Sequence, residues 1–227
     1  MPLPDPEVTP FGDSAALVQL DGPASAQALA RELRRDPPPG VIACVPGLES
    51  LLVQFDPLVI DEASVRQLVA ARLGSAAVAG ELPGRIRTVP VVYGGDHGPD
   101  LDEVARVAGM TAQGVIDAHS TAELRVLFNG FAPGFTYLGD LPEGIRVPRL
   151  ATPRTRTPRG SVAIAGAMSG IYPADLPGGW RVIGRTPLEL FDPRRDPPAY
   201  LVPGDRVRFI AIAADEWEAA AREQGGW

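Results

Sequence analysis

The sequence predicts an α+β protein with two domains, a small α+β domain over residues 1–84 and an antiparallel barrel or sandwich over residues 85–227. Strand and helix patterns alternate through residues 14–73, which is typical of a small sheet covered by helices. From residue 88 onward, short apolar segments recur between prolines and glycines, which is typical of antiparallel barrels and sandwiches. Residues 75–84 between these regions are small, weakly patterned and interrupted by proline and glycine, so we place the domain boundary there.

The first domain is predicted to have the element order βαββα. Its first helix covers residues 24–35, because Pro23 favours the first helical position. Its second helix covers residues 62–73, with Asp61 as the N-terminal cap and Gly74 as the stop. The strands are predicted at residues 14–20, 41–45 and 50–55.

The second domain begins with a strand over residues 88–93. Asp100 and Glu103 have the spacing of a capping box, which predicts a helix over 101–108. A second helix, 112–119, ends at a histidine, and no helix is evident between residues 130 and 212. Further strands are predicted at 123–128, 161–166, 180–184, 187–191 and 205–212, and a last helical segment at 215–224.

Composition excludes several classes of function. The net charge is −7 with a pI near 4.9, so a nucleic-acid or anionic-membrane partner is not expected. All 21 basic residues are arginine, which removes lysine Schiff-base chemistry and a Walker A lysine from this chain. The single cysteine, Cys44, excludes an internal disulfide, and with two histidines it leaves too few ligands for an ordinary zinc site. We therefore expect no metal site and a cytoplasmic location.

His119 is the main candidate for acid–base chemistry. It lies at the end of a predicted helix, where the helix dipole favours a protonated imidazole, and just before the strand that leads into an aromatic loop. It could act as a general acid or base, or as an anion-binding group. The alternative is a histidine that caps the helix by bonding backbone carbonyls. The other histidine, His97, has the surroundings of a turn residue.

An arginine-rich segment forms a cationic strip in this acidic protein. No acidic residue occurs between Glu143 and Asp175, and Arg154 and Arg156 near the centre of the strip are candidate ligand-binding residues. Arginine binds carboxylate and phosphate in a bidentate manner, and the prolines would keep the strip extended. A patch for another subunit or a solvated loop explains the pattern equally well. The arginine strip comprises Arg146, Arg149, Arg154, Arg156 and Arg159.

Two loops combine glycine, proline and aromatic residues. The stretch GFAPGFTYLG, residues 130–139, holds three glycines and three aromatic rings, and residues 166–180 have a similar composition. Glycine permits close approach of the backbone to a ligand, and aromatic rings can form a pocket wall. Gly178 and Gly179 could present backbone amides to an anion. The alternative is that these glycines turn the corners of a barrel.

Several blocks of sequence are specific enough to identify a family. In order, they include YGGDHGPDLDEVA, FNGFAPGFTYLGDLP, SGIYPADLPGGWRVIGRTPLELFDP and LVPGDRVRFI. Together they closely resemble the family of the 5-oxoprolinase B subunit. That family also includes the first subunit of allophanate hydrolase-type proteins and KipI, an inhibitor of a sporulation histidine kinase. The resemblance covers most of residues 88–210 and extends more weakly into the N-terminal part.

The resemblance implies a fold, an activity and partners. The fold is a small α+β domain followed by a cyclophilin-like antiparallel β-barrel. The activity is the ATP-dependent opening of 5-oxoproline to glutamate, by a complex that also contains an A subunit and a second barrel protein, the C subunit. Whether ATP contacts this chain is left open. The alternatives are a subunit of the allophanate hydrolase type that acts on another small amide, or a non-enzymatic histidine-kinase inhibitor; prolyl isomerase activity would rest on fold analogy alone.

The resemblance also implies site residues. His119 matches the family's histidine at the end of a helix and is the implied catalytic residue. The chain departs from the family pattern at Asn129, where leucine is common, and at Met168 and Ser169, where glutamine and threonine are common. Together with the centre of the arginine strip, the predicted substrate-binding residues are Asn129, Gly134, Phe135, Tyr137, Arg154, Arg156, Ser169, Tyr172, Gly178, Gly179 and Trp180.

Overall fold

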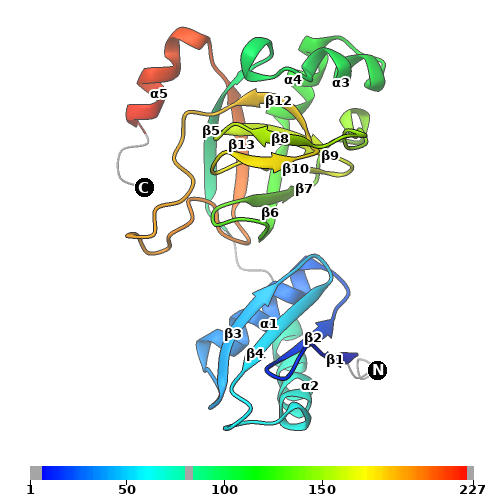
Figure 1. Ribbon diagram of the computed structural model, residues 1–227, viewed down its shortest axis with the longest axis vertical. Helices are drawn as coiled ribbons and strands as arrows, with labels where there is room; N and C mark the ends of the chain where they lie inside the picture. The colour runs from blue at the N-terminus through cyan, green and yellow to red at the C-terminus, as the bar shows by residue number, and fades with distance from the viewer. Residues whose placement is uncertain (1–6, 80–83, 224–227) are drawn as a thin grey trace. The chain divides into compact units, whose positions relative to one another are not determined.

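The computed structural model describes residues 7–79 and 84–223, and Figure 1 shows the course of the chain. It contains two compact units, Met1–Pro83 and Gly84–Trp227. The predicted α+β fold is confirmed, because the first unit combines a sheet with two helices and the second contains a closed barrel. In the part of the chain that is described, no helix has the length and apolar character needed to cross a membrane.

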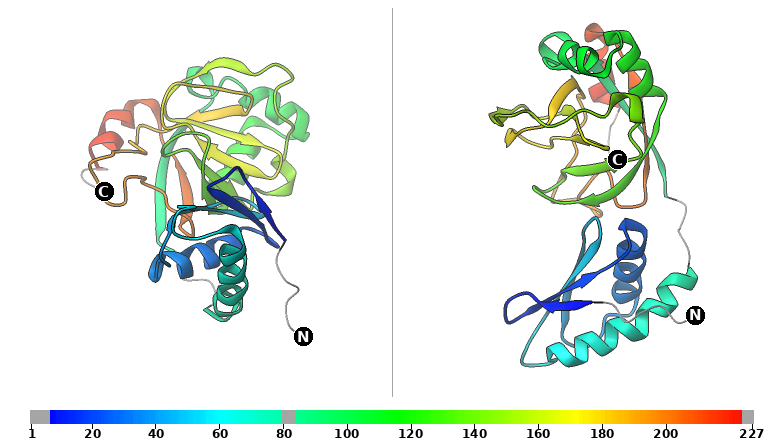
Figure 2. Two further views of the ribbon diagram at one scale, coloured as in Figure 1. Left: turned by 60° about the horizontal axis from the view of Figure 1, so that its bottom comes forward. Right: turned by 90° about the vertical axis from the view of Figure 1, so that its right-hand side faces the viewer.

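The first unit is a four-stranded antiparallel sheet with the strand order β1-β2-β4-β3. Both of its helices lie on the same face of this sheet (Figure 2) and enclose one apolar core with it. Strand β1 was not predicted, because three residues carry too little pattern. The elements are β1 (Val8–Pro10), β2 (Ala15–Gln19), α1 (Pro23–Arg35), β3 (Val41–Pro46), β4 (Ser50–Phe55) and α2 (Glu62–Ala79).

Helix α2 is longer than the sequence pattern predicts. Asp61 caps it as expected, since its Oδ1 accepts a hydrogen bond from the backbone amide of Ser64 at 2.8 Å. Gly74 does not end it, and the helix continues to Ala79. A glycine inside a helix costs only about 1 kcal/mol relative to alanine, and most of the residues that follow are alanine. The predicted stop at Gly74 was therefore wrong.

The second unit is built on a closed barrel with the strand order β10-β7-β6-β13-β5-β12-β9. One pair departs from the antiparallel prediction, because β13 runs parallel to β5 while pairing antiparallel with β6. A separate two-stranded sheet contains β8 (Arg154–Thr157) and β11 (Leu176–Gly178). The barrel strands are β5 (Ile86–Tyr93), β6 (Glu123–Asn129), β7 (Thr136–Gly139), β9 (Ser161–Ala165), β10 (Met168–Ile171), β12 (Arg181–Arg185) and β13 (Arg206–Ala211).

Helices α3 (Leu101–Ala108) and α4 (Ala112–Thr121) lie at one end of the barrel (Figure 1), and α5 (Trp217–Glu223) confirms the predicted terminal helical segment. The side chain of Thr111 caps α4 by accepting from the amide of Gly114 at 3.0 Å. The capping box predicted for α3 does not form, because the Asp100 carboxylate instead accepts from the backbone amide of Val182 at 2.6 Å. The predicted strand 187–191 was also wrong, since only one isolated bridge occurs there.

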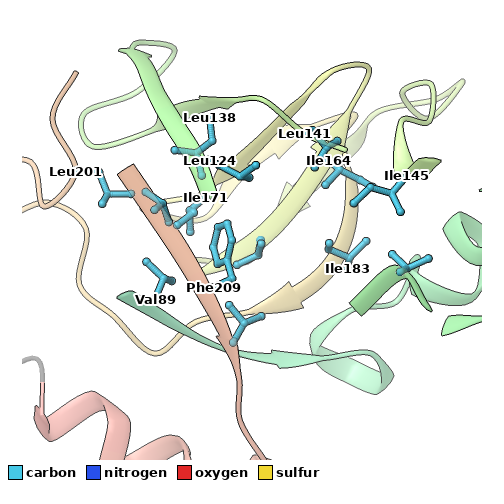
Figure 3. Packing of buried hydrophobic residues seen from close by; sticks show 14 of the residues in the cluster. Val89, Leu124, Leu138, Leu141, Ile145, Ile164, Ile171, Ile183, Leu201 and Phe209 are labelled. Atoms are coloured by element: carbon cyan, nitrogen blue, oxygen red, sulfur yellow. The ribbon is translucent and has the colours of Figure 1, made fainter. Parts of the chain in front are cut away.

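The barrel wall has two apolar faces, and this arrangement positions the candidate site. Inward-facing side chains, with Phe209 near the middle of the group in Figure 3, form the barrel core. All five residues of β9 are buried: Val162 and Ile164 belong to the barrel core, whereas Ala163 and Ala165 belong to a separate cluster. Because side chains alternate along a strand, that second cluster lies against the outer face of the wall.

Candidate functional site

The loop that joins β6 to β7 begins with a γ-turn. The amide of Ala132 donates to the carbonyl of Gly130 at 2.8 Å, and Phe131 between them has a φ of 68°. A bulky residue in the left-handed region is strained by about 1–2 kcal/mol. Phe131 is also 61% exposed, so its strained backbone presents an aromatic ring to the surface.

A second turn follows directly and explains the proline and glycine in the loop. The amide of Phe135 donates to the carbonyl of Ala132 at 3.0 Å around Pro133 and Gly134, whose φ is 81°. Proline followed by a glycine with positive φ is the signature of a type II turn. A Cβ at Gly134 would also lie 2.7 Å from the Cβ of Phe191. The composition of the loop therefore encodes two tight turns that place Phe135 directly before β7.

Four rings form an aromatic cluster on the outer face of the barrel wall. The Phe135 centroid lies 4.9 Å from that of Tyr137, 5.1 Å from Tyr172 and 5.9 Å from Trp180, all edge to face. Phe135, Tyr172 and Trp180 are buried, whereas Tyr137 is half-buried and stacks on Phe128 at 4.3 Å. The two glycine-rich loops of the sequence thus come together. We call Phe135, Tyr137, Tyr172 and Trp180 the aromatic cluster.

Two glycines leave room for these rings. A Cβ at Gly178 would lie 2.1 Å from the hydroxyl oxygen of Tyr172, and one at Gly170 would lie 3.1 Å from the ring of Trp180. The first contact is too short for any real Cβ, so Gly178 is required where it stands. Gly179 differs, because a Cβ there would first meet Pro153 at an ordinary 3.5 Å.

His119 lies on the inner side of the barrel wall in a chain of hydrogen bonds. Its Nδ1 lies 2.8 Å from the hydroxyl of Tyr93, and its Nε2 lies 3.0 Å from the hydroxyl of Ser169. The Ser169 hydroxyl donates to the carbonyl of Ala163 at 3.2 Å. Because this bond uses the only proton of the Ser169 hydroxyl, its oxygen accepts a hydrogen bond from the Nε2–H of His119. Nδ1 of His119 is then unprotonated, and it accepts a hydrogen bond from the Tyr93 hydroxyl.

The histidine is neutral in this setting. His119 is fully buried and stacks on Phe209 at a centroid distance of 4.4 Å. Burial lowers the pKa of His119 to about 3, because a charged imidazole would lose its hydration without gaining a carboxylate. Burial likewise raises the pKa of the Tyr93 phenol. Both imidazole nitrogens are bonded to neutral hydroxyls, which favours a positioning role over direct contact with a solute.

Strand β10 connects the histidine to the aromatic cluster. Ser169 pairs with Leu138, which belongs to the barrel core, whereas Gly170 pairs with Tyr137 of the aromatic cluster. Cross-strand partners face the same side of a sheet, so Ser169 faces inward and Gly170 outward. Met168 also packs against the outer cluster. The structure therefore places Ser169 with His119 and separates both from the aromatic cluster by the thickness of one strand.

Most of the arginine strip is engaged in interactions within the protein. Arg154 forms an ion pair with Asp100 at 2.5 Å, and both Arg156 and the amide of Arg159 bond the carboxylate of Asp175. These bonds tie the centre of the strip to Asp100 and Asp175. They also leave the two arginines predicted to bind substrate with their charges already compensated.

Asn129 ends β6 next to the γ-turn. Its side-chain amide donates to the carbonyl of Leu201 at 2.9 Å. Its Oδ1 is buried and finds no hydrogen-bond partner among the described residues. Asn129 pairs across the strands with Thr136, which precedes Tyr137. It therefore lies at the base of the same loop that carries the aromatic cluster.

Sequence reasoning did not identify two residues of this region. Tyr93 completes the hydrogen bonding of His119 from a strand 26 positions earlier, and nothing in the strand pattern marks its hydroxyl. Arg149 belongs to the strip but was not selected within it, and its guanidinium lies 5.8 Å from the centroid of the Trp180 ring. The proximity of arginine and tryptophan becomes visible only once the loops are folded.

Comparison with known proteins identifies the family. Residues 6–201 match the family described as carboxyltransferase domain, subdomain C and D. The chain is 38% identical to the 5-oxoprolinase B subunit of Bacillus subtilis, over 96% of this chain and 97% of the relative. It is 42% identical to the 5-oxoprolinase B subunit of Escherichia coli O157:H7, over 88% and 93%.

The chain belongs to the family of the 5-oxoprolinase B subunit. The resemblance seen in the sequence blocks is therefore confirmed. The structure of a conserved uncharacterized protein from Pyrococcus horikoshii is 38% identical, with a TM-score of 0.58, over 93% of this chain and 100% of that one. The structure of TTHA0988 is 35% identical with a TM-score of 0.75 and matches 88% of this chain, which spans only 40% of that longer protein.

The family fold also occurs in larger enzymes. The urea amidolyase of Kluyveromyces lactis matches 97% of this chain with a TM-score of 0.77, and the chain spans 16% of that protein. The identity is 21%, so this likeness extends to the fold alone. The B-subunit family thus shares its architecture with one part of a much longer protein.

Proposed function

We propose that this chain acts as the B subunit of an ATP-dependent 5-oxoprolinase, which converts 5-oxo-L-proline to L-glutamate together with an A subunit and a C-type barrel subunit. The observation that carries the proposal is the identity of 38% to 42% with three 5-oxoprolinase B subunits, each over at least 88% of this chain. The absence of disulfide chemistry in a chain with one cysteine fits a reducing cytoplasm.

In this proposal the aromatic cluster binds the lactam. Its half-buried member, Tyr137, is partly accessible and packs edge to face with Phe135 and Trp180. A flat five-membered ring packs favourably on such a surface, and the apolar surroundings exclude water from the amide. The exposed ring of Phe131 extends the site toward the surface that a partner in the complex would complete.

We assign His119 a positioning role in the same site. Its hydrogen bonds tie Tyr93 on β5 to Ser169 on β10. At the next residue of β10, Gly170, an added Cβ would lie 3.1 Å from the ring of Trp180 and 3.2 Å from that of Phe135, so the cluster packs closely over this strand. Loss of the imidazole would leave the Tyr93 hydroxyl without its acceptor and the Ser169 hydroxyl without its donor, and we expect it to shift the strand next to the aromatic cluster.

The compensated arginines of the strip speak against a triphosphate site at its centre. A triphosphate needs several uncompensated cations or a cradle of backbone amides. Arg154 and Arg156 are each bonded to a carboxylate, and the Arg159 side chain lies 3.8 Å from Glu189. We therefore propose that another member of the complex holds ATP, and that this chain binds and orients the lactam.

The test is lactam-stimulated ATP hydrolysis by the reconstituted complex. The chain is co-expressed with its A and C partners, and ATP hydrolysis is measured with and without 5-oxo-L-proline. We expect stimulation by the lactam. Tyr137→Ala should reduce it at least about tenfold while the complex still assembles, because the ring contributes on the order of 1–3 kcal/mol of binding. Trp217→Ala removes a half-buried ring elsewhere in the same unit and serves as the matched control.

The other outcomes separate the alternatives. Stimulation that survives Tyr137→Ala would keep the activity of the complex but place the lactam site in another of its members. A complex that assembles and is stimulated by a different small amide would favour the allophanate hydrolase-type alternative. A complex stimulated by no amide would contradict the proposal and turn attention to inhibition of a histidine kinase.

A further inference from the structure

Arg149 differs from the other members of the arginine strip. Among the residues that the structure describes, no carboxylate, carbonyl or hydroxyl is bonded to its guanidinium, and the side chain is exposed. Each neighbour in the strip has a partner, since Arg146 donates to the carbonyl of Leu141 at 2.9 Å and the remaining three are engaged as described above. Among the described residues, Arg149 is therefore the member of the strip whose guanidinium has neither a hydrogen bond nor an ion pair, and it is available to an external anion.

The backbone on both sides of Arg149 is fixed. The amide of Gly166 donates to the carbonyl of Val147 at 2.8 Å, and Nε of Arg181 donates to the carbonyl of Pro148 at 3.0 Å. The amide of Leu150 donates to the carbonyl of Gly179 at 2.8 Å. An exposed arginine on a mobile loop would lose much conformational entropy on binding, whereas this one starts from an anchored backbone.

The guanidinium of Arg149 lies beside the aromatic cluster, near its two tyrosines, Tyr137 and Tyr172. It sits over the ring of Trp180, which restricts the arginine by a cation–π contact. Burial raises the pKa values of Tyr137 and Tyr172, and the charge of Arg149 opposes that shift in both, so the cation lies within electrostatic range of both phenols. The Tyr137 hydroxyl makes no hydrogen bond to any described residue and is free to donate.

We propose that Arg149, together with the hydroxyl of Tyr137, forms a carboxylate-binding site that selects a lactam carrying a carboxylate. The inference rests on the proposed function and deepens it, because 5-oxo-L-proline has one carboxylate beside its lactam. A guanidinium can donate to both oxygens of a carboxylate in a bidentate pair, and a phenol can donate a further hydrogen bond to one of them. The ring of the substrate then lies against the aromatic cluster.

This assignment explains why selectivity would come from Arg149 and not from Arg154 or Arg156. A substrate carboxylate at either of those positions would have to displace Asp100 or Asp175 from an existing ion pair. At Arg149 it gains a charge-assisted pair without breaking one. A site built to pair a group also rejects the analogue that lacks it, because the site's own polar groups stay unpaired.

The test compares two lactams in the reconstituted complex. The KM and kcat of ATP-coupled hydrolysis are measured for 5-oxo-L-proline and for 2-pyrrolidinone, which is the same ring without the carboxylate. We expect the wild-type complex to use 2-pyrrolidinone less well than 5-oxo-L-proline. We expect Arg149→Ala to raise the KM for 5-oxo-L-proline by about 10- to 100-fold, with a much smaller change in kcat, and to change turnover of 2-pyrrolidinone far less. Arg149→Lys should fall between, since an ammonium keeps the charge but loses the bidentate geometry.

Arg159→Ala is the matched control. It removes one exposed positive charge from the same strip, so a general electrostatic effect would appear in both variants. An unchanged KM for 5-oxo-L-proline in Arg149→Ala overturns the inference. An equal loss with both lactams also overturns it, because the effect would then not depend on the carboxylate.

A wild-type complex that neither lactam stimulates would contradict the proposed function, and the carboxylate site is then judged by binding. Calorimetric titration of the assembled complex with 5-oxo-L-proline should show binding that is lost in Arg149→Ala and kept in Arg159→Ala. Absence of binding to the wild-type complex, or binding that does not depend on Arg149, overturns the inference independently of turnover.

Discussion

Acidification from pH 7.5 to 5.0 should destabilise the barrel unit through His119. Its pKa is lowered to about 3 in the folded protein, whereas an imidazole in the unfolded chain titrates near 6.5. Between these two values the unfolded state binds a proton that the folded state does not. The contribution of His119 to the free energy of unfolding is therefore constant above about pH 7, and it falls as the pH decreases toward 3.

The magnitude follows from the two pKa values. At pH 5.5 the unfolded imidazole is about ten times more often protonated than neutral, which favours unfolding by about 1.4 kcal/mol. At pH 5.0 the cost is about 2 kcal/mol. His119 is fully buried, so solvent does not screen this effect. Domains have only about 5–15 kcal/mol of stability, and the loss is large enough to measure.

Urea unfolding followed by tryptophan fluorescence isolates the relevant unit. The three tryptophans, at positions 180, 217 and 227, all belong to the second unit. The wild-type protein should lose about 2 kcal/mol between pH 7.5 and 5.0. His119→Gln should lose much less over that range, although its stability at pH 7.5 is lower. His97→Gln removes the only other histidine and should keep the wild-type profile. A His119→Gln profile parallel to that of the wild type would refute the reasoning.

Three further outcomes are expected from the same unfolding assay at pH 7.5. Gly178→Ala should lower the free energy of unfolding by about 1–3 kcal/mol, because its Cβ would collide with the Tyr172 hydroxyl. Gly179→Ala should change it by less than about 0.5 kcal/mol. Equal effects of the two variants would contradict the packing argument. Phe131→Gly should be more stable than Phe131→Ala by about 1 kcal/mol, the reverse of the usual order, because residue 131 has positive φ. Tyr93→Phe should cost about 1–3 kcal/mol by leaving Nδ1 of His119 unpaired, and a neutral result would mean that the bond contributes nothing.

Local pattern was sufficient for much of the fold. Helices α1, α3 and α4 lie within two residues of their predicted bounds at each end, although the capping box that predicted α3 does not form. The glycine-rich loop before β7 was recognised because proline and positive-φ glycines have few uses outside tight turns. These features depend on residues that are close together in the sequence, and such features can be read without the fold.

Features that depend on distant pairs could not be predicted. Asp100 has the spacing of a helix cap, but its carboxylate is taken by Val182, 82 positions later, and by Arg154, 54 positions later. The arginine is a cation and the amide of Val182 is buried, so both bind the carboxylate more strongly than an exposed cap would. The parallel pairing of β13 with β5 likewise closes the barrel from opposite ends of the second unit, where no turn signal exists.

The candidate site was found by composition but its internal roles were assigned only by geometry. The aromatic cluster joins the two predicted loops, as the shared composition suggested. The arginine strip was predicted from its composition, yet sequence gives no means of telling a compensated arginine from a free one. Asp175 is 19 positions from Arg156, and Arg149 is marked only by the absence of such a partner among the described residues.

The buried hydrogen bonds of His119 also bear on the precision of the outer site. A strand that slips by one position exchanges its two faces, and β10 carries Met168 and Gly170 on the outer face and Ser169 and Ile171 on the inner face. Ser169 is the one position of this strand whose hydroxyl reaches both Nε2 of His119 and the carbonyl of Ala163. A slip would place Met168 or Gly170 there and leave Nε2 of the imidazole without a partner in an apolar interior, which is costly. A polar contact inside the barrel therefore fixes the register that presents Gly170 to the aromatic cluster outside.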